Sequence, residues 1–163
     1  MTSPQHVVHE LVSELDYPMF IVTVAADGER AGCLVGFTTQ CSINPPRFLV
    51  CLSDKSRTFR VAEVASVMVV HLVPREQEEL ANLFGERTGD ELDKFERCAW
   101  SPGPEGTPIL DACGNWFAGR ILGRFAAGDH HAFLLDPFEV ASDAEQDQFA
   151  FHRAKRMDPG HEA

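Results

Sequence analysis

Residues 19–52, MFIVTVAADGERAGCLVGFTTQCSINPPRFLVCL, decide the fold of this chain. Three runs within this stretch are rich in the β-branched and aromatic residues that strands favour, namely residues 19–25, 30–43 and 47–52. Ala26-Asp27-Gly28 is typical of a hairpin turn, and Asn44-Pro45-Pro46 forces a second turn. The stretch therefore predicts three antiparallel strands, the second of them bent at Gly32 and Gly36.

The same pattern of short elements continues on both sides of this stretch. Ser3-Pro4 predicts the start of a first helix, because serine caps helices and proline fits the first helical position. The remaining predicted elements are helices at 56–64 and 74–84, strands at 67–73, 112–125 and 132–140, and a long polar loop at 86–106. Strands dominate and do not alternate regularly with helices. We therefore expect a mainly β fold, a closed or nearly closed barrel with a few short helices.

The 163 residues suit one domain with a full hydrophobic core. The expected parts are an N-terminal helix in residues 1–17, the barrel in residues 18–141 and a polar C-terminal tail in residues 142–163. Gly85 is expected to end the second short helix, and Gly128-Asp129-His130 to form the turn between the last two strands. A loop as long as residues 86–106 is usually functional or wraps a partner.

The composition excludes several classes of protein. A net charge of −11 disfavours nucleic-acid binding, which needs a basic surface. No run approaches the roughly 18 apolar residues that cross a membrane, and the first residues lack the features of a signal peptide. The five cysteines are scattered without a CxxC pair, which disfavours a disulfide framework and a structural zinc site. We expect a cytoplasmic protein that binds no metal, no nucleic acid and no membrane.

Residues 54–58, Asp-Lys-Ser-Arg-Thr, lie between a predicted buried strand and a predicted helix. Backbone N–H groups at a helix start have no intrahelical partner, and the helix dipole favours an anion there. The Ser56 and Thr58 hydroxyls and the Lys55 and Arg57 cations complete a candidate phosphate site. The alternative is an ordinary serine cap beside surface cations, which these residues alone favour.

Residues 32–42, GCLVGFTTQCS, form a second candidate site. Its two glycines let a flat ligand approach the backbone closely. The side chains that offer donors and acceptors to the polar edge of a flavin are Thr38, Thr39, Gln40 and Ser42. The same glycines would equally relieve crowding at a bend in a barrel strand, so both interpretations stay open.

His130 follows Gly128-Asp129 at the last predicted turn. A histidine there is a candidate proton donor or a hydrogen-bond partner for a phosphate or a nicotinamide, although most turn histidines are simply solvated. His71 and His152 are distant from this turn in sequence, so no local spacing supports metal ligation there. No serine lies in a GxSxG setting, and Cys41 and Cys51 fall in strands expected to be buried, where a thiol is inert. The sequence therefore does not indicate a hydrolase.

In their order and spacing, these pieces resemble the flavin reductase-like family, whose fold is the FMN-binding split barrel. The resemblance covers roughly residues 18–140. Its pieces are Phe20-Ile21-Val22-Thr23-Val24, residues 32–42, Pro45-Pro46 with residues 48–52, Ser56-Arg57-Thr58, residues 80–85 (LANLFG), Asp93-Lys94-Phe95 and Gly128-Asp129-His130. No single piece is specific, whereas their order is, and the order favours the phosphate interpretation of Ser56-Arg57-Thr58.

The resemblance implies a role for each matching position. The residues expected to edge the flavin ring are Val35, Gly36, Phe37, Thr38 and Thr39 on one strand and Cys51, Leu52 and Ser53 on the next. Those expected at the phosphate are Lys55, Ser56, Arg57 and Thr58, and those expected to border the cofactor are Phe84 and Gly85. His130 is the expected catalytic residue, placed near the flavin and the nicotinamide.

The chemistry implied by the family is hydride transfer from NADH or NADPH to FMN or FAD in a homodimer, with a flavin-dependent monooxygenase as a candidate partner. This chain departs from the family pattern at Gly36-Phe37, where many members carry a polar residue followed by serine. An aromatic ring there would stack on the flavin or narrow access to it. Three alternatives remain: a flavin carrier or electron-transfer protein without turnover, a haem-binding split barrel, and a dimeric interaction module without a cofactor.

Overall fold

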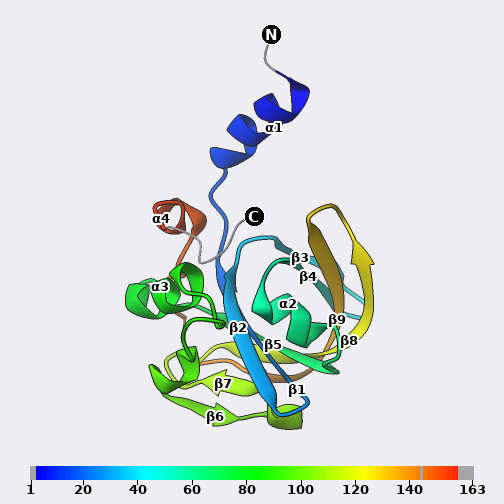
Figure 1. Ribbon diagram of the computed structural model, residues 1–163, viewed down its shortest axis with the longest axis vertical. Helices are drawn as coiled ribbons and strands as arrows, with labels where there is room; N and C mark the ends of the chain where they lie inside the picture. Colours follow the sequence, from blue (N-terminus) through cyan, green and yellow to red (C-terminus); the bar gives the residue numbers. More distant parts are fainter. Residues whose placement is uncertain (1–2, 144, 158–163) are drawn as a thin grey trace.

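Seven antiparallel strands form the main sheet of the molecule (Figure 1). The computed structural model describes residues 3–143 and 145–157 of the chain. In spatial order the strands are β2 (Glu29–Val35), β1 (Phe20–Ala26), β5 (Val67–Leu72), β8 (Trp116–Ala126), β9 (His130–Ala141), β4 (Arg47–Ser53) and β3 (Thr38–Ser42). This architecture confirms the predicted mainly β fold with a few short helices.

The two edge strands of this sheet, β2 and β3, are joined by Gly36 and Phe37 alone. The predicted strand at 30–43 is therefore wrong as a single strand, although the bend falls at Gly36 as expected. A Cβ atom on Gly36 would lie 2.7 Å from the Tyr17 ring and 2.9 Å from the Met19 sulfur, so a larger residue at this bend would force these side chains to move. The Cys51 N–H donates to the Phe37 carbonyl over 2.9 Å, so the hydrogen bonding between β3 and β4 extends into the bend between β2 and β3. The sheet curls because one short segment connects its opposite edges.

The β1–β2 hairpin follows the local sequence closely. Ala26 pairs with Glu29, which leaves a loop of Asp27 and Gly28. Their φ angles are 52° and 78°, the conformation of a two-residue turn that matches the twist of antiparallel strands.

Helix α2 (Arg57–Ala62) lies within the curve of the sheet (Figure 1). Its Thr58, Phe59, Val61 and Ala62 side chains are buried. They meet an inner core that includes alternate residues of β1, such as Val22 and Val24. The intervening residues of β1, such as Ile21, face a second apolar cluster on the other side of the sheet. Strand β1 is therefore buried on both faces.

Helix α3 (Glu78–Glu86) and helix α4 (Phe151–Ala154) pack outside the sheet (Figure 1). The predicted helix at 74–84 begins later than expected, because Pro74 forms a bridge with Gln148. Gly85 lies inside α3 and does not end it, so the prediction of a glycine cap is wrong. A Cβ atom on Gly85 would lie 3.0 Å from Leu34, which explains the glycine by close packing.

Part of the segment expected to form a polar C-terminal tail, around residues 147–151, contacts the rest of the chain. Phe149 is fully buried. Its N–H donates to the Val73 carbonyl over 2.8 Å, and its carbonyl accepts from the Met19 N–H over 2.9 Å. This segment thus covers the start of β1 and the end of β5.

The predicted loop at 86–106 contains structure that the sequence did not indicate. It holds two 3₁₀ turns, η1 (Lys94–Glu96) and η2 (Pro104–Gly106), and strand β6 (Trp100–Pro102), which pairs with β7 (Pro108–Leu110). Elements of three residues are too short to show a period in the sequence.

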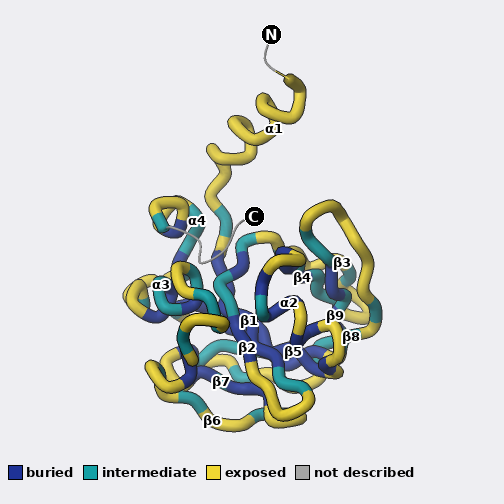
Figure 2. The backbone as a smooth tube through the Cα atoms, in the orientation of Figure 1, coloured by how far each residue is buried: buried dark blue, intermediate teal, exposed yellow. Residues whose placement is uncertain are grey.

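Helix α1 (Pro4–Ser13) extends away from the rest of the molecule (Figure 2). Ser3 caps it as predicted, with its hydroxyl oxygen accepting from the His6 N–H. Its apolar side chains are largely exposed, including Val8 at 56% and Leu11 at 71%. In the part of the chain that the structure describes, no helix is both long and apolar enough to span a membrane.

Candidate functional site

A cavity of about 500 Å³ runs along β2. Ten consecutive residues, 28–37, line it from the hairpin to the bend. The other walls include residues 51–53 at the end of β4, residues 56–58 at the start of α2, Phe84 and Gly85 in α3, residues 87–89 and 92–95 of the following loop, and His130. A volume of this size is typical of small-molecule and cofactor sites.

The free edge of β2 forms one side of this cavity. The Lys94 ammonium group donates to the Gly32 carbonyl over 3.0 Å, so the backbone groups of Gly32 point away from β1. In an antiparallel pair the N–H and C=O of one residue lie on the same side, and this side alternates along the strand. Arg30 and Leu34 therefore present their backbone groups at the same edge. This edge offers hydrogen-bonding groups to a flat polar ligand.

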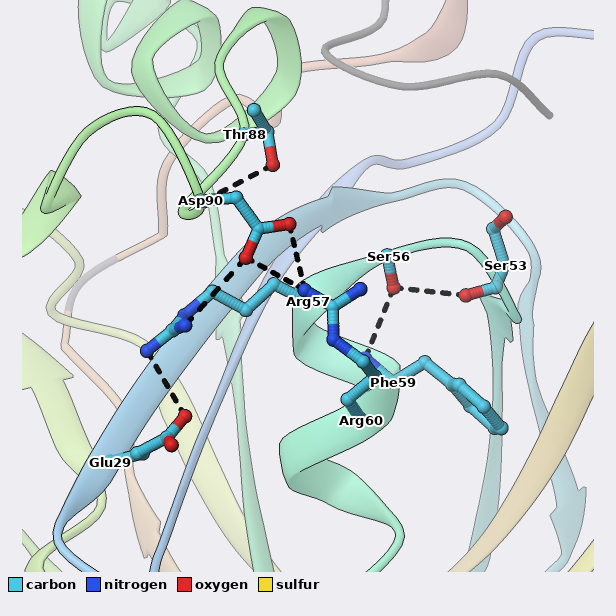
Figure 3. A network of polar contacts seen from close by, with 8 residues as sticks. All are labelled: Glu29, Ser53, Ser56, Arg57, Phe59, Arg60, Thr88 and Asp90. Carbon is cyan, nitrogen blue, oxygen red and sulfur yellow. Dashed lines mark hydrogen bonds and ion pairs between the residues drawn. The ribbon is translucent and has the colours of Figure 1, made fainter.

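Ser56 is buried at the start of α2. Its hydroxyl donates to the Ser53 carbonyl over 2.9 Å and accepts from the Phe59 N–H over 3.0 Å (Figure 3). The hydroxyl proton is thus already committed to a backbone carbonyl, and the side chain acts as a helix cap. A phosphate here would rely on other donors unless Ser56 rotates.

Arg57 lies between two carboxylates in Figure 3. Its guanidinium is 3.1 Å from the Glu29 carboxylate and 3.7 Å from that of Asp90. Arg60 contacts both oxygens of Asp90 at 2.7 Å, and this hydrogen bonding lowers the pKa of Asp90. A Cβ atom on Gly89 would lie 2.7 Å from Arg57 Cδ, so the loop packs directly on the arginine stem. The charge of Arg57 is therefore already compensated within the chain.

The other end of the cavity holds His130 and Phe37. Their rings lie 5.0 Å apart between centroids. His130 Nδ1 is 2.7 Å from the Asp129 carboxylate, and this hydrogen bond lowers the pKa of Asp129. The contact fixes the ring orientation, because Nδ1 is engaged at the turn and only Nε2 remains to meet a ligand.

Most of the residues that the sequence nominated meet at this cavity. Those that line it are Val35, Gly36, Phe37, Cys51, Leu52, Ser53, Ser56, Arg57, Thr58, Phe84, Gly85 and His130. Thr38, Thr39 and Lys55 are not among its lining residues. The two threonines follow the bend, where the chain has crossed to β3 at the opposite edge of the sheet. Lys55 is exposed in the turn before α2.

Sequence reasoning missed several lining residues, among them Tyr17, Met19, Arg30, Phe95 and Phe151. Tyr17 and Phe151 stack at 4.7 Å with their planes 10° apart, although 133 residues separate them in the chain. No local pattern marks such a pair. Arg30 directly follows the hairpin, and its guanidinium lies 4.8 Å from the centre of the Trp100 ring.

The thiols differ in part from the prediction made for Cys41 and Cys51. Cys41 is exposed and Cys51 is half-buried, so the expectation that both lie in buried strands is wrong for Cys41. β3 is an edge strand whose side chains are not covered. Burial raises the pKa of the Cys33 and Cys51 thiols, which keeps both protonated. Within residues 3–143 and 145–157, no three His, Cys, Asp or Glu side chains gather as metal ligands would.

Comparison with known proteins identifies relatives along nearly the whole chain. The family model described as Flavin reductase like domain matches residues 12–159. A probable flavin reductase of Rhizobium meliloti (strain 1021) is 31% identical over 113 residues, which cover 67% of this chain and 35% of that protein. The FMN reductase (NADH) RutF of Methylorubrum extorquens (strain DSM 6343 / CIP 106787 / DM4) is 28% identical over 142 residues, which cover 87% of this chain and 69% of that protein. The chain thus spans only about a third of the length of the first of these relatives.

A solved structure shows the same fold. The flavin reductase domain protein from Arthrobacter sp. FB24 superposes with a TM-score of 0.83 at 23% identity, over 91% of each chain. This likeness confirms the split-barrel fold that the sequence predicted.

Proposed function

The chain belongs to the flavin reductase-like family, and from this membership we propose that it binds FMN or FAD beside β2 and catalyses hydride transfer to it from NADH or NADPH. The observation that supports this most is that the cavity joins the free edge of β2, the start of α2 and the His130 turn. A bound flavin supplies the redox chemistry itself. The chain's own residues then have to bind, orient and shield it.

The cavity suits a flavin in size and in chemistry. Its volume of about 500 Å³ lies within the range of cofactor sites. Val35, Leu52 and Phe84 give it apolar walls, while the backbone edge at Gly32 and Leu34 supplies hydrogen-bonding groups. Apolar walls with a few polar groups at defined positions match a planar ring system whose polar groups lie at one end.

We propose different roles for the two ends of the cavity. We expect the phosphate beside Arg57 and Thr58 and the ring near Phe37, Cys51 and Ser53. His130, held by Asp129, is then available to position the nicotinamide through its Nε2 atom. The half-exposed side chain of His130 and the exposed ring of Phe37 leave this end open to a second substrate.

The proposed working form is a homodimer in the cytoplasm. Val8, Leu11, Val12 and Leu15 form an apolar stripe at helical spacing on and beside α1, and each is more than 40% exposed. A projecting apolar stripe of this kind is typical of an interface. We propose a second copy of this chain as its occupant, and a flavin-dependent monooxygenase as the consumer of reduced flavin. The five free thiols support a reducing compartment.

Purified protein incubated with FMN and NADH tests the function. We expect the protein to bind FMN, to be dimeric by light scattering, and to accelerate NADH oxidation measured at 340 nm in the presence of air. FMN binding without faster NADH oxidation would contradict the reductase and support a carrier. A Soret band after haem titration would support a haem-binding barrel, and no ligand-induced rise in Tm would favour an interaction module.

A further inference from the structure

Lys94 is a buried cation in the wall of the cavity. Its side chain is only 5% exposed. The ammonium group donates to the Gly32 carbonyl and to the Phe84 carbonyl, each over 3.0 Å, and lies 5.4 Å from the centre of the Phe84 ring. These contacts join the edge of β2 to the last turn of α3. An ammonium group has three N–H donors, so two backbone carbonyls leave one of them for a ligand.

No carboxylate in the described part of the chain pairs with Lys94. The titratable group beside it is the Cys33 thiol, which is neutral because burial raises its pKa. A buried charge without an opposite charge is costly in a folded protein. Burial accordingly lowers the pKa of Lys94.

Arg57 also lines the cavity, but unlike Lys94 it has carboxylate partners. Glu29 and Asp90 already compensate its charge, and it is more exposed than Lys94. Thr58, one residue further along α2, is buried beside the Cys33 thiol, which in turn lies close to Lys94. The buried positive charge of the cavity, without a carboxylate partner in the described residues, therefore lies next to the start of α2, on the β2 side. Arg87 also lines the cavity without an ion pair in the described residues, but its side chain is exposed to solvent.

We propose that the Lys94 ammonium group is the principal positive charge that binds the phosphate of the flavin. This inference rests on the proposed function, because it requires a flavin in the cavity. The phosphate would supply the anion that residues 3–143 and 145–157 do not provide for Lys94. Its oxygens would accept the third N–H and restore electrical balance at the buried edge of β2.

The test compares FMN with riboflavin, which has the same ring and no phosphate. Dissociation constants for both are measured by quenching of flavin fluorescence with the wild-type chain, Lys94→Met and Lys155→Met. The control removes the same charge from an exposed lysine beyond α4. We expect Lys94→Met to weaken FMN binding by roughly tenfold to a hundredfold more than riboflavin binding, the range of a charge-assisted hydrogen bond. Lys155→Met should leave the ratio of the two constants unchanged.

Equal weakening of both ligands would overturn the proposal, because Lys94 would then only hold β2 against α3. A folded variant that binds both ligands as tightly as the wild-type chain would overturn it as well. If Lys94→Met does not fold, Lys94→Gln keeps amide donors for the two carbonyls without the charge, and the same loss of FMN preference is expected. A wild-type chain that binds neither ligand would overturn the flavin site itself, whereas tight riboflavin binding with an unchanged ratio would overturn only the role of Lys94.

Discussion

The surroundings of His71 and those of Lys94 are two buried polar regions with different chemistry. His71 is fully buried in β5, and both of its ring nitrogens have partners. Nδ1 is 2.9 Å from the Ile21 carbonyl, and Nε2 accepts from the Leu110 N–H over 3.0 Å. Since Nε2 accepts, the proton lies on Nδ1, and the ring is a neutral link between β1, β5 and β7.

Both ring nitrogens of the neutral His71 thus have hydrogen-bond partners within the fold. Lys94 also has hydrogen-bond partners, but its positive charge has no counter-charge in the described residues. The difference teaches that contacts within the fold account for His71, while the described residues leave the charge of Lys94 without a counter-charge.

The largest expected effect tests the first region. His71→Ala should destabilise the protein by about 3–5 kcal/mol, because it leaves a cavity and two unpaired backbone groups in the core. Urea unfolding followed by circular dichroism measures the change. His9→Ala, on the exposed face of α1, is the matched control and should cost less than about 0.5 kcal/mol. A similar small cost for His71→Ala would mean that the ring does not link the strands.

A slightly smaller effect is expected from pH alone. Burial lowers the pKa of His71 from 6.5 to about 4, so the unfolded chain binds a proton in a range where the folded chain does not. Stability from this group is complete above pH 6.5 and declines as pH falls to about 4, by roughly 3 kcal/mol in total. Unfolding curves between pH 7.5 and 4 measure the decline. His71→Gln should flatten it, and an equally steep decline in that variant would assign the effect to other groups.

The smallest effects concern the cations of the cavity. Arg57→Gln should weaken FMN binding by only about two- to fivefold, because Glu29 and Asp90 already offset its charge. Asp90→Asn should act in the opposite direction and tighten FMN binding by roughly two- to threefold, since it releases Arg57 and Arg60. Titrations at fixed ionic strength measure both. A loss above tenfold in Arg57→Gln would erase the contrast between Arg57 and Lys94.

Features of the fold that depend on a few neighbouring residues were predictable from the sequence. The caps at Ser3 and Ser56 form as expected, because a serine before a helix satisfies N–H groups close to it in the chain. The Asp27-Gly28 turn forms for a similar reason, since its residues tolerate positive φ.

Features that depend on distant contacts were not predictable. The strand at 30–43 looks continuous in sequence, and the contacts of Gly36 with Tyr17 and Met19 divide it. Gly85 resembles a helix cap, yet the side chain of Leu34 explains it. The β6–β7 pair and the packing of Phe149 likewise have no local signature.

The sequence by itself determined the mainly β character of the chain, the serine caps, the β1–β2 hairpin and the turn residues around a candidate phosphate site, because those depend on chemistry within a few residues. Only the tertiary structure decided which of the cations has a partner. Arg57 meets Glu29 from the β1–β2 hairpin and Asp90 from the loop after α3, while Lys94 donates to two backbone carbonyls and pairs with no carboxylate in the described residues. Compensation of charge is a property of long-range contacts, so it becomes visible only when distant segments are brought together.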